Sequence, residues 1–403
     1  MKTSEMLIYI LLSSFLIYGC NAKGEDKKKD LRSLSDPVII DITKIKETNT
    51  PLKLSQFADS ISYIRLSGDV FPESTLLTTI KIIEDTIFLD YDNVYKYTPD
   101  GKFIKKVFDE KKSGENIKVG KAAYNNKERY FTVSTRSTTT FKFNNYKNYS
   151  FDGLFLGETI YQVENISKKI ETYFNNYCVY RNEPEVSTNK KINRLGSNLF
   201  YVENTNTNSI FYSHPNPASG DIYPYKHGSD SQPANTTFIS IDSVLWFKHI
   251  VIDTIYSTKD FVTILPRYIF ITDESYMDIH KYTQLKNGLL DDNEIHKLKH
   301  IWGFLPFPAT GEILLNLGYC LVFTDRSCNT FAYSAKHIIN DIDEYLNVID
   351  IATYITNNTF YIENNSLYIL IKAEEFFKEG CKPPFDNLKE NDAPIVLKLE
   401  LKK

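Results

Sequence analysis

Several features that would settle the class of this 403-residue chain at once are missing from it. The apolar run near its start, Met6–Tyr18, holds 13 residues, whereas a membrane-spanning helix needs about 20. The formal net charge is only −4 and the lysines are scattered, so no basic field attracts nucleic acid. The phosphate-binding and dinucleotide-binding glycine loops, the Gly-x-Ser-x-Gly elbow and the His-Glu-x-x-His zinc motif are also absent. No motif therefore indicates a nucleotide-binding protein, a serine hydrolase or a zinc protease.

What remains is the composition of a globular protein rich in aromatic residues. Hydrophobic residues make up 42% of the chain and charged residues 24%, which is enough apolar material for a core. The 28 Tyr and 26 Phe far outnumber the 3 Met. Because aromatic and β-branched side chains fit a pleated, half-buried surface, this bias favours β-structure.

The N-terminus is typical of a secretory signal. Its apolar run is followed by Ile17-Tyr18-Gly19-Cys20, which resembles a bacterial lipobox with an aliphatic residue at −3 and a small residue at −1. The alternatives are an ordinary signal peptide or a buried core helix. The lipobox interpretation predicts a signal peptide over 1–19 and lipidation of Cys20, whose acyl chains would hold the protein on a membrane.

Residues 20–36 are polar and charged, and they are predicted to be a flexible tether. A lipid anchor followed by a tether predicts a protein of the cell envelope, held on the outer membrane and facing either the periplasm or the cell surface. The membrane is then one expected partner, and the remaining residues, 37–403, form the folded body.

That body contains a repeated unit. The segments "YTPDGKFI" (97–104) and "YSFDGLFL" (149–156) share one pattern, in which Asp-Gly separates two strand-like runs. Glycine accepts a positive φ without steric cost and aspartate tolerates one, so each Asp-Gly predicts a tight hairpin. Four further segments read as strand, polar turn and strand: 197–214, 253–270, 312–334 with a turn near Asp325–Asn329, and 358–376 with a turn at Glu363–Asn365.

Six such units predict an all-β fold, and a period of about 50 residues favours a six-bladed β-propeller of antiparallel blades. The last segment, 393–403, alternates apolar and polar residues, and the first segment of the body, 37–43, is also strand-like. Because an N-terminal strand commonly closes the last blade of a propeller, we expect 37–43 to pair with the C-terminal blade.

Five segments in this order resemble the six-bladed β-propeller lipoproteins of Bacteroidota, a family whose domain has no known function. They are "LSQFADSISYIRL" (54–66), "TIFLDYDNVYKYTPDGKFI" (86–104), "DTIYSTKDFVTILPRYIF" (253–270), "HIIND" (337–341) and "ENDAPIVLKLELK" (390–402). Many family members carry a glycine-rich loop after the first blade, of which only Ser113-Gly114-Glu115 remains in this chain.

Candidate chemical groups are few. His296 and His300 would share one face of a helix and could hold a metal, but an excursion between blades explains them as well. Asp341 and Asp343 resemble part of a calcium loop that lacks its glycine and its distant glutamate, so a turn between strands is the simpler interpretation. Three further carboxylates, Asp90, Asp92 and Asp100, lie close together in the sequence. The alternation of a strand and the following hairpin explain their positions as well as a functional site does.

An exported protein can form disulfides, and Cys320 and Cys328 lie close enough to one predicted hairpin to meet; buried free thiols are the alternative. The aromatic residues could stack on sugars or pack the blades together, and packing is the simpler role.

The resemblance, the tether and the missing motifs favour a non-catalytic propeller without cofactor, metal or catalytic residues. Such a protein would bind a glycan, peptide or protein at the channel mouth, in a role linked to nutrient or glycan capture, or serve as a scaffold. The alternative is a propeller hydrolase or lyase with an axial metal site, which would need at least three convergent acidic or histidine side chains. A mouth lined by exposed aromatic and amide side chains would favour binding.

Overall fold

The computed structural model describes residues 36–403 apart from these positions: 49, 69–70, 73, 92, 108–116, 138–142, 160–161, 164–165, 183–184, 187–192, 196–197, 216–219, 223–235, 250–251, 279, 282–283, 285–296, 326, 328 and 334–336. Pro37–Lys403 form one compact unit, which contains the strands described below. Within the described residues, no helix has the length and apolar character needed to cross a membrane.

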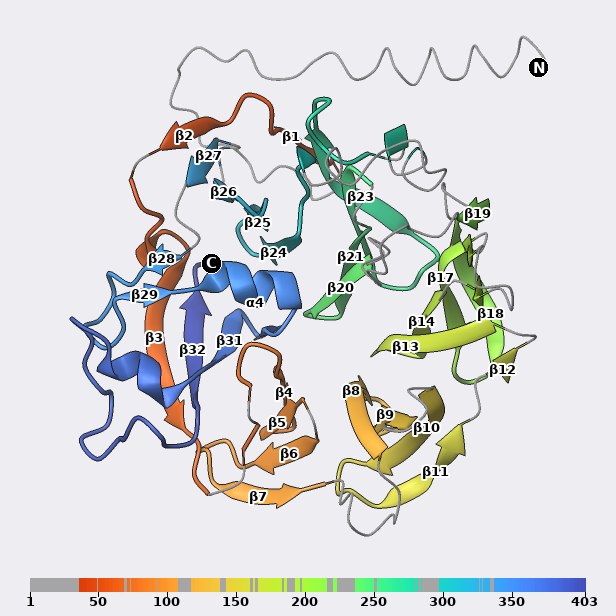
Figure 1. Cartoon of the computed structure of the whole chain (residues 1–403), viewed down its shortest axis with the longest axis horizontal. Coiled ribbons are helices and arrows are strands. Elements are labelled where there is room, and N and C mark those ends of the chain that lie inside the picture. The colour runs from red at the N-terminus through yellow and green to blue at the C-terminus, as the bar shows by residue number, and fades with distance from the viewer. Residues whose placement is uncertain are drawn as a thin grey trace. The chain divides into compact units, whose positions relative to one another are not determined.

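Six sheets are arranged as the blades of a six-bladed β-propeller, which confirms the predicted all-β fold (Figure 1). Blade 1 consists of β4 (Thr79–Ile83), β5 (Thr86–Asp90), β6 (Val94–Tyr97) and β7 (Phe103–Lys106). Blade 2 consists of β8 (Ile117–Asn125), β9 (Tyr130–Ser137), β10 (Phe143–Ser150) and β11 (Phe155–Thr159). Blade 3 consists of β12 (Gln162–Val163), β13 (Ile166–Phe174), β14 (Tyr177–Asn182), β17 (Asn198–Asn204) and β18 (Ser209–Pro215).

The other three blades each combine late strands with one early strand. Blade 4 consists of β20 (Thr236–Ile241), β21 (Val244–His249), β22 (Thr254–Thr258), β23 (Ile264–Ile271) and β1 (Val38–Asp41). Blade 5 consists of β24 (Gly303–Phe307), β25 (Glu312–Asn316), β26 (Leu321–Thr324), β27 (Thr330–Tyr333) and β2 (Lys46–Thr48). Blade 6 consists of β30 (Tyr361–Glu363), β31 (Ser366–Ile371), β32 (Ile395–Leu401) and β3 (Ala58–Arg65).

Shorter elements complete the unit. A small sheet is formed by β15 (Glu185–Val186), β16 (Asn193–Leu195) and β19 (Gly220–Ile222), and a two-stranded one by β28 (Ile338–Ile339) and β29 (Val348–Ile349). The helical elements are η1 (Leu54–Gln56), α4 (Ile351–Asn357) and η3 (Ala373–Phe377).

The predicted closure of the last blade is correct, but the strand assigned to it is wrong. Residues 38–41, within the predicted 37–43, form β1, which pairs in parallel with β23 of blade 4. The next strand, β2, pairs in parallel with β27 of blade 5. It is β3 that pairs antiparallel with the C-terminal strand β32 and closes blade 6. The strand-like sequence of 37–43 identified a strand, but a strand-like sequence alone does not identify the partner of a strand.

Both Asp-Gly hairpins are confirmed, between β6 and β7 and between β10 and β11. Their glycines have φ values of +84° at Gly101 and +76° at Gly153. At Gly101 a Cβ atom would lie 2.1 Å from the carbonyl oxygen of Arg65, so the closing strand β3 leaves no room for a side chain there.

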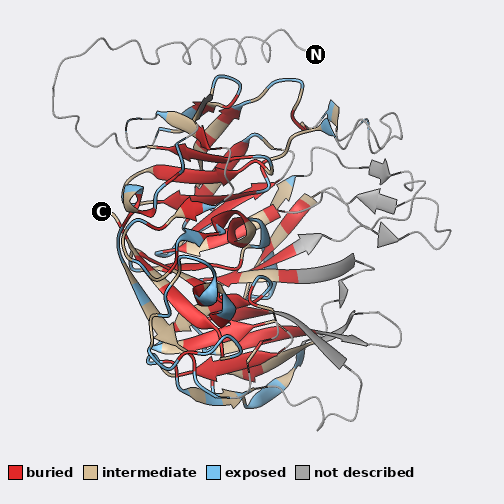
Figure 2. Ribbon diagram, turned by 60° about the vertical axis from the view of Figure 1, so that its left-hand side comes forward, coloured by how far each residue is buried: buried red, intermediate tan, exposed pale blue. Residues whose placement is uncertain are grey.

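Each blade buries both of its faces between its neighbours, and Figure 2 shows buried residues concentrated in the strands. In β32, Leu397 and Leu399 pack with blade 5, while Val396 points to the opposite side and packs with blade 1. Aromatic rings fill these interfaces, as where Phe200 of blade 3 meets Phe238 of blade 4 at 5.1 Å between centroids. Packing between blades is therefore a role of the aromatic residues.

Candidate ligand-binding cleft

The inner strands of the blades surround a cavity of about 380 Å³ at one mouth of the central channel. Its wall comes from β4, β8, β13, β20 and β30, and its rim from the first turn of several blades. The cavity holds three acidic side chains, Glu171, Asp242 and Glu363. Burial and the charge of Asp242 raise the pKa of Glu363, although a hydrogen bond to Tyr361 opposes the shift. In the described part of the chain, no three His, Cys, Asp or Glu side chains gather closely enough to hold a metal ion.

Polar groups on the rim join one blade to the next. Blades 1 and 2 are linked by the ion pair of Glu84 and Arg129, and blades 2 and 3 by Lys127 donating to Asn176. Asp242 of blade 4 accepts a hydrogen bond from the backbone N–H of Asn364 of blade 6 at 3.1 Å. These side chains hold the ring together.

The short helix α4 lies against β24 at the inner edge of blade 5 (Figure 1). Asp350 caps its N-terminus by accepting bonds from the backbone N–H and the hydroxyl of Thr353. Gly303 of β24 permits the close approach, because a Cβ atom there would lie 2.6 Å from the carbonyl oxygen of Ile355. Asn316 of β25 completes the contact by donating to the carbonyl oxygen of Ala352 at 3.1 Å.

On its other side α4 borders a larger cleft of about 870 Å³, which we call the blade 5–6 cleft. The walls come from the segment 297–302 before β24, the turn 317–319 between β25 and β26, one side of α4 from Ala352 to Asn357, and the connection from β31 to β32. The residue Asn358 that follows α4 lines the channel cavity instead, so the helix separates the two spaces.

An exposed tryptophan dominates one wall of this cleft. Trp302 is 47% exposed, whereas the other tryptophan of the chain, Trp246, is 6% exposed and packs in the core. The backbone N–H of Trp302 donates to the carbonyl oxygen of Asn316 at 2.8 Å. Gly318 lies directly beneath the indole, because a Cβ atom there would be 2.5 Å from Nε1. The glycine therefore lets the indole approach the backbone closely, while about half of the residue stays exposed.

Beside Trp302 lies a cation held on two tyrosine rings. The Lys299 ammonium is 5.0 Å from the ring centroid of Tyr319 and 5.5 Å from that of Tyr276, within range for cation–π attraction. The two tyrosine hydroxyls lie 2.8 Å apart and hydrogen-bond to each other. The backbone of Lys299 is fixed as well, because it exchanges hydrogen bonds with Ser275 and Met277.

His300 is one of the two histidines that could share a helix face, and its partner His296 lies outside the described residues. The His300 ring meets the Trp302 ring edge to face at 5.2 Å between centroids. Burial and the nearby charge of Lys248 lower the pKa of His300, so the imidazole is neutral at pH 7. Sequence reasoning selected this residue for metal binding but missed Trp302, because a single tryptophan produces no spacing pattern.

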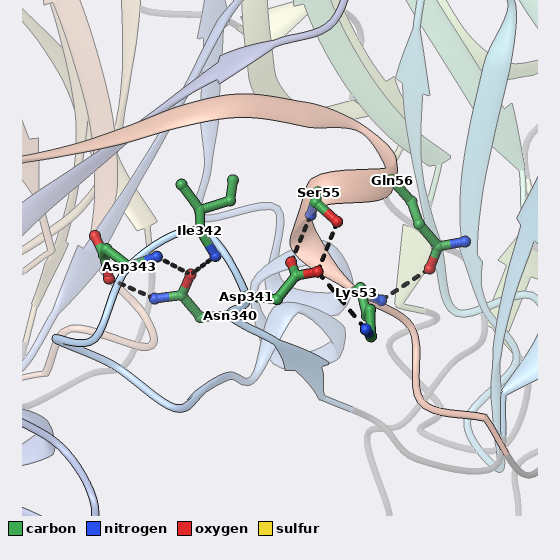
Figure 3. Close-up of polar contacts among 7 residues, drawn as sticks. All are labelled: Lys53, Ser55, Gln56, Asn340, Asp341, Ile342 and Asp343. Atoms are coloured by element: carbon green, nitrogen blue, oxygen red, sulfur yellow. Dashed lines mark hydrogen bonds and ion pairs between the residues drawn. The ribbon is translucent and has the colours of Figure 1, made fainter.

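Figure 3 shows that Asp341 and Asp343 are used in structural contacts. Asp341 accepts from the backbone N–H of Ser55 at 2.9 Å and from its hydroxyl at 2.7 Å. Asp343 accepts from the amide of Asn340 at 2.7 Å and from the hydroxyl of Tyr63 at 3.0 Å. The turn interpretation accounts for both carboxylates, which fasten the early segment to the late one.

The remaining predicted residues do not meet in one place. Asp90 is buried and accepts from the backbone of Ala122, whereas Asp100 lies at a hairpin and pairs with Lys102 at 2.8 Å. Cys320 is buried at the start of β26. Three residues lie outside the described part of the chain: Cys20, Asp92 and Cys328. The pairing of Cys320 with Cys328 stays a prediction.

The fold defines the class of this protein as a six-bladed β-propeller. The family model described as "Domain of unknown function (DUF4933)" matches residues 23–269, and the chain belongs to that family. This confirms the predicted resemblance to propellers of Bacteroidota that have no known function.

Solved structures resemble the chain in fold at low sequence identity. One is a protein of Bacteroides fragilis described as exported, with 13% identity and a TM-score of 0.56, covering 91% of this chain and 100% of its own. Another is a DUF4221 family member from Bacteroides vulgatus, with 11% identity and a TM-score of 0.45, covering 88% of this chain and 99% of its own. No curated protein matches the sequence.

Proposed function

We propose that this protein is an exported, non-catalytic binding protein that holds a glycan in the blade 5–6 cleft. The observation that carries the proposal is the half-exposed indole of Trp302 in a cleft of about 870 Å³. Ligand sites are concave and combine apolar or aromatic surface with a few polar groups. A large aromatic ring left half in water gains free energy when the apolar C–H face of a sugar covers it.

The cleft meets the other requirement for sugar binding, which is a set of polar groups around the stacking surface. His337 and Asn357 lie in its wall, together with Lys297 and Lys299. Such side chains can exchange hydrogen bonds with sugar hydroxyls. At the channel mouth, by contrast, rim side chains such as Glu84 and Asp242 already bond to other blades. We therefore place the ligand in the cleft.

The test uses the fact that the chain has only two tryptophans, one exposed and one buried. The purified protein is screened against neutral and acidic oligosaccharides by calorimetry, and each binder is added while tryptophan fluorescence is recorded. We expect the binder to change the emission of the wild type but not that of Trp302→Phe, in which only Trp246 remains. Trp302→Ala should weaken binding about tenfold or more, equivalent to about 1.4 kcal/mol.

The matched control is Phe211→Ala, which removes an aromatic ring of similar exposure from β18 of blade 3. It should leave the affinity unchanged. Unaltered binding by Trp302→Ala, or no binding to any oligosaccharide, would contradict the proposal.

The same proposal includes the membrane anchor. It is supported by the lipobox-like Ile17–Cys20, the polar tether of 20–36, and the description of the B. fragilis structure as an exported protein. We expect Cys20→Ser to move the protein from the membrane fraction to the soluble fraction of envelope extracts. Mass spectrometry of the N-terminus is the second measurement, and an unmodified Cys20 in the wild-type protein would refute lipidation.

A further inference from the structure

We infer that the sugar taken by the blade 5–6 cleft carries an anionic group, which pairs with the ammonium of Lys299 while the ring stacks on Trp302. This inference rests on the proposed function and adds the chemical class of the ligand. It is drawn from the position, the support and the charge surroundings of Lys299.

Lys299 is a preorganised cation. The hydrogen-bonded rings of Tyr276 and Tyr319 both contact its ammonium. The backbone N–H and carbonyl oxygen of Lys299 are both held by hydrogen bonds. A lysine normally loses much side-chain entropy when it forms a contact. Because Lys299 is already held in place, less of that entropy remains to be lost when an anion binds.

Among the residues that the structure describes, no carboxylate lies within ion-pair distance of Lys299. The nearby carboxylate of Asp273 is only influenced through space, because the charge of Lys299 helps to lower its pKa. The two acidic residues of the cleft are engaged elsewhere. Asp350 caps α4, and Glu375 forms an ion pair with Lys378 at 2.5 Å. Among the described residues, neither Lys297 nor Lys299 forms an ion pair with a carboxylate, in a molecule whose formal net charge is −4.

The position of the Lys299 ammonium next to the indole of Trp302 indicates that the ligand is an anionic sugar. Lys299 and Trp302 lie on the same segment of the cleft wall, with His300 between them against the indole. A sugar with its apolar face on Trp302 would present its ring substituents to the neighbouring ammonium. Carboxylate and sulfate are the anionic substituents that sugars commonly carry, and either would form a charge-assisted hydrogen bond with it.

The experiment compares two ligands that differ only in charge. Calorimetry is carried out on the purified protein with tri-galacturonate and with its methyl ester, at low and high salt. A sulfated disaccharide serves as a third ligand that distinguishes sulfate from carboxylate. We expect an anionic sugar to bind at least tenfold more tightly than the ester and to bind more weakly in high salt.

Lys299→Met should reduce affinity for the anionic sugar to that for the ester and leave the ester unchanged, whereas Lys299→Arg should keep the preference. The matched control is Lys81→Met, because Lys81 also lies over a tyrosine ring, at 4.8 Å from that of Tyr361, but lines the channel cavity. Thermal melting of each variant reports whether it is folded.

The outcomes separate the two proposals. Equal binding of charged and neutral sugars, with both lost in Trp302→Ala, would overturn the anionic class and leave the glycan site intact. A preference for charge that persists in Lys299→Met would overturn the role of Lys299. Failure of every oligosaccharide to bind would overturn the proposed function itself.

Discussion

Among single residues, Lys248 of β21 has the most unusual environment. Its side chain is 3% exposed, and its ammonium donates to the carbonyl oxygen of His249 at 2.9 Å. Burial lowers the pKa of Lys248 to about 7, although the charge of Asp253 acts in the opposite direction. Burying an ammonium disfavours its charged form, so the folded protein releases this proton far more easily than an unfolded chain does.

The sign of the resulting pH dependence follows from proton binding. Between pH 7 and about 10.4 the unfolded chain holds a proton on Lys248 that the folded protein lacks, so the free energy of unfolding rises with pH. Below pH 7 both states are protonated and the contribution is constant. We expect Lys248→Met to be more stable than the wild type at pH 6–7, by a few kcal/mol in order of magnitude, with the advantage shrinking toward pH 10. Urea unfolding across this range measures the difference.

Lys106→Met removes an exposed lysine and serves as the control. We expect its free energy of unfolding to differ from that of the wild type by the same amount at every pH. Parallel stability curves for the wild type and Lys248→Met would show that Lys248 keeps an ordinary pKa.

At the scale of elements, the sequence identified hairpins better than it identified partners. The Asp-Gly turns at Gly101 and Gly153 were predictable because each glycine must adopt a positive φ. Three two-residue turns place both of their residues at positive φ without any glycine, at Glu84-Asp85, Asp242-Ser243 and Asn364-Asn365. Only the last of these three was anticipated, because two adjacent asparagines indicate a turn more strongly than Glu-Asp or Asp-Ser does.

The early strands β1, β2 and β3 form the outer edges of blades 4, 5 and 6. Removing residues 1–66 deletes all three and leaves β23, β27 and β32 with unpaired backbone groups. We expect this shortened chain to aggregate or to melt at least about 10 °C below the full chain. Circular dichroism during heating, together with gel filtration, provides the measurement.

A chain that lacks only residues 1–36 retains every described strand and serves as the control. It should melt at the temperature of the full chain. Cooperative melting of the shorter 67–403 chain at that same temperature would mean that the early strands contribute little to stability.

At the scale of the whole molecule, repetition in the sequence predicted the six blades, but the cleft could not be predicted. Its walls come from 297–302, from 317–319 and from α4, which meet only after the blades have assembled. His300 was noticed because a second histidine lies four positions away, whereas the position of Trp302 depends on the close approach of Gly318, a residue in a different turn. Contacts of this kind depend on tertiary structure and leave no periodic signal in one sequence.

The distribution of the first strands over the last three blades also sets the order in which the chain can fold. Ser55 bonds to Asp341, 286 positions later, and Arg65 to Asp392, 327 positions later. Blades 1 and 2 contain only local pairings and can form as soon as they are synthesised, but the ring stays open until the final strand is available. Folding of such non-local pairs is slow, because the closure entropy of a long loop precedes their stabilisation. The two ends of the chain can therefore join only after synthesis of the last strand is complete.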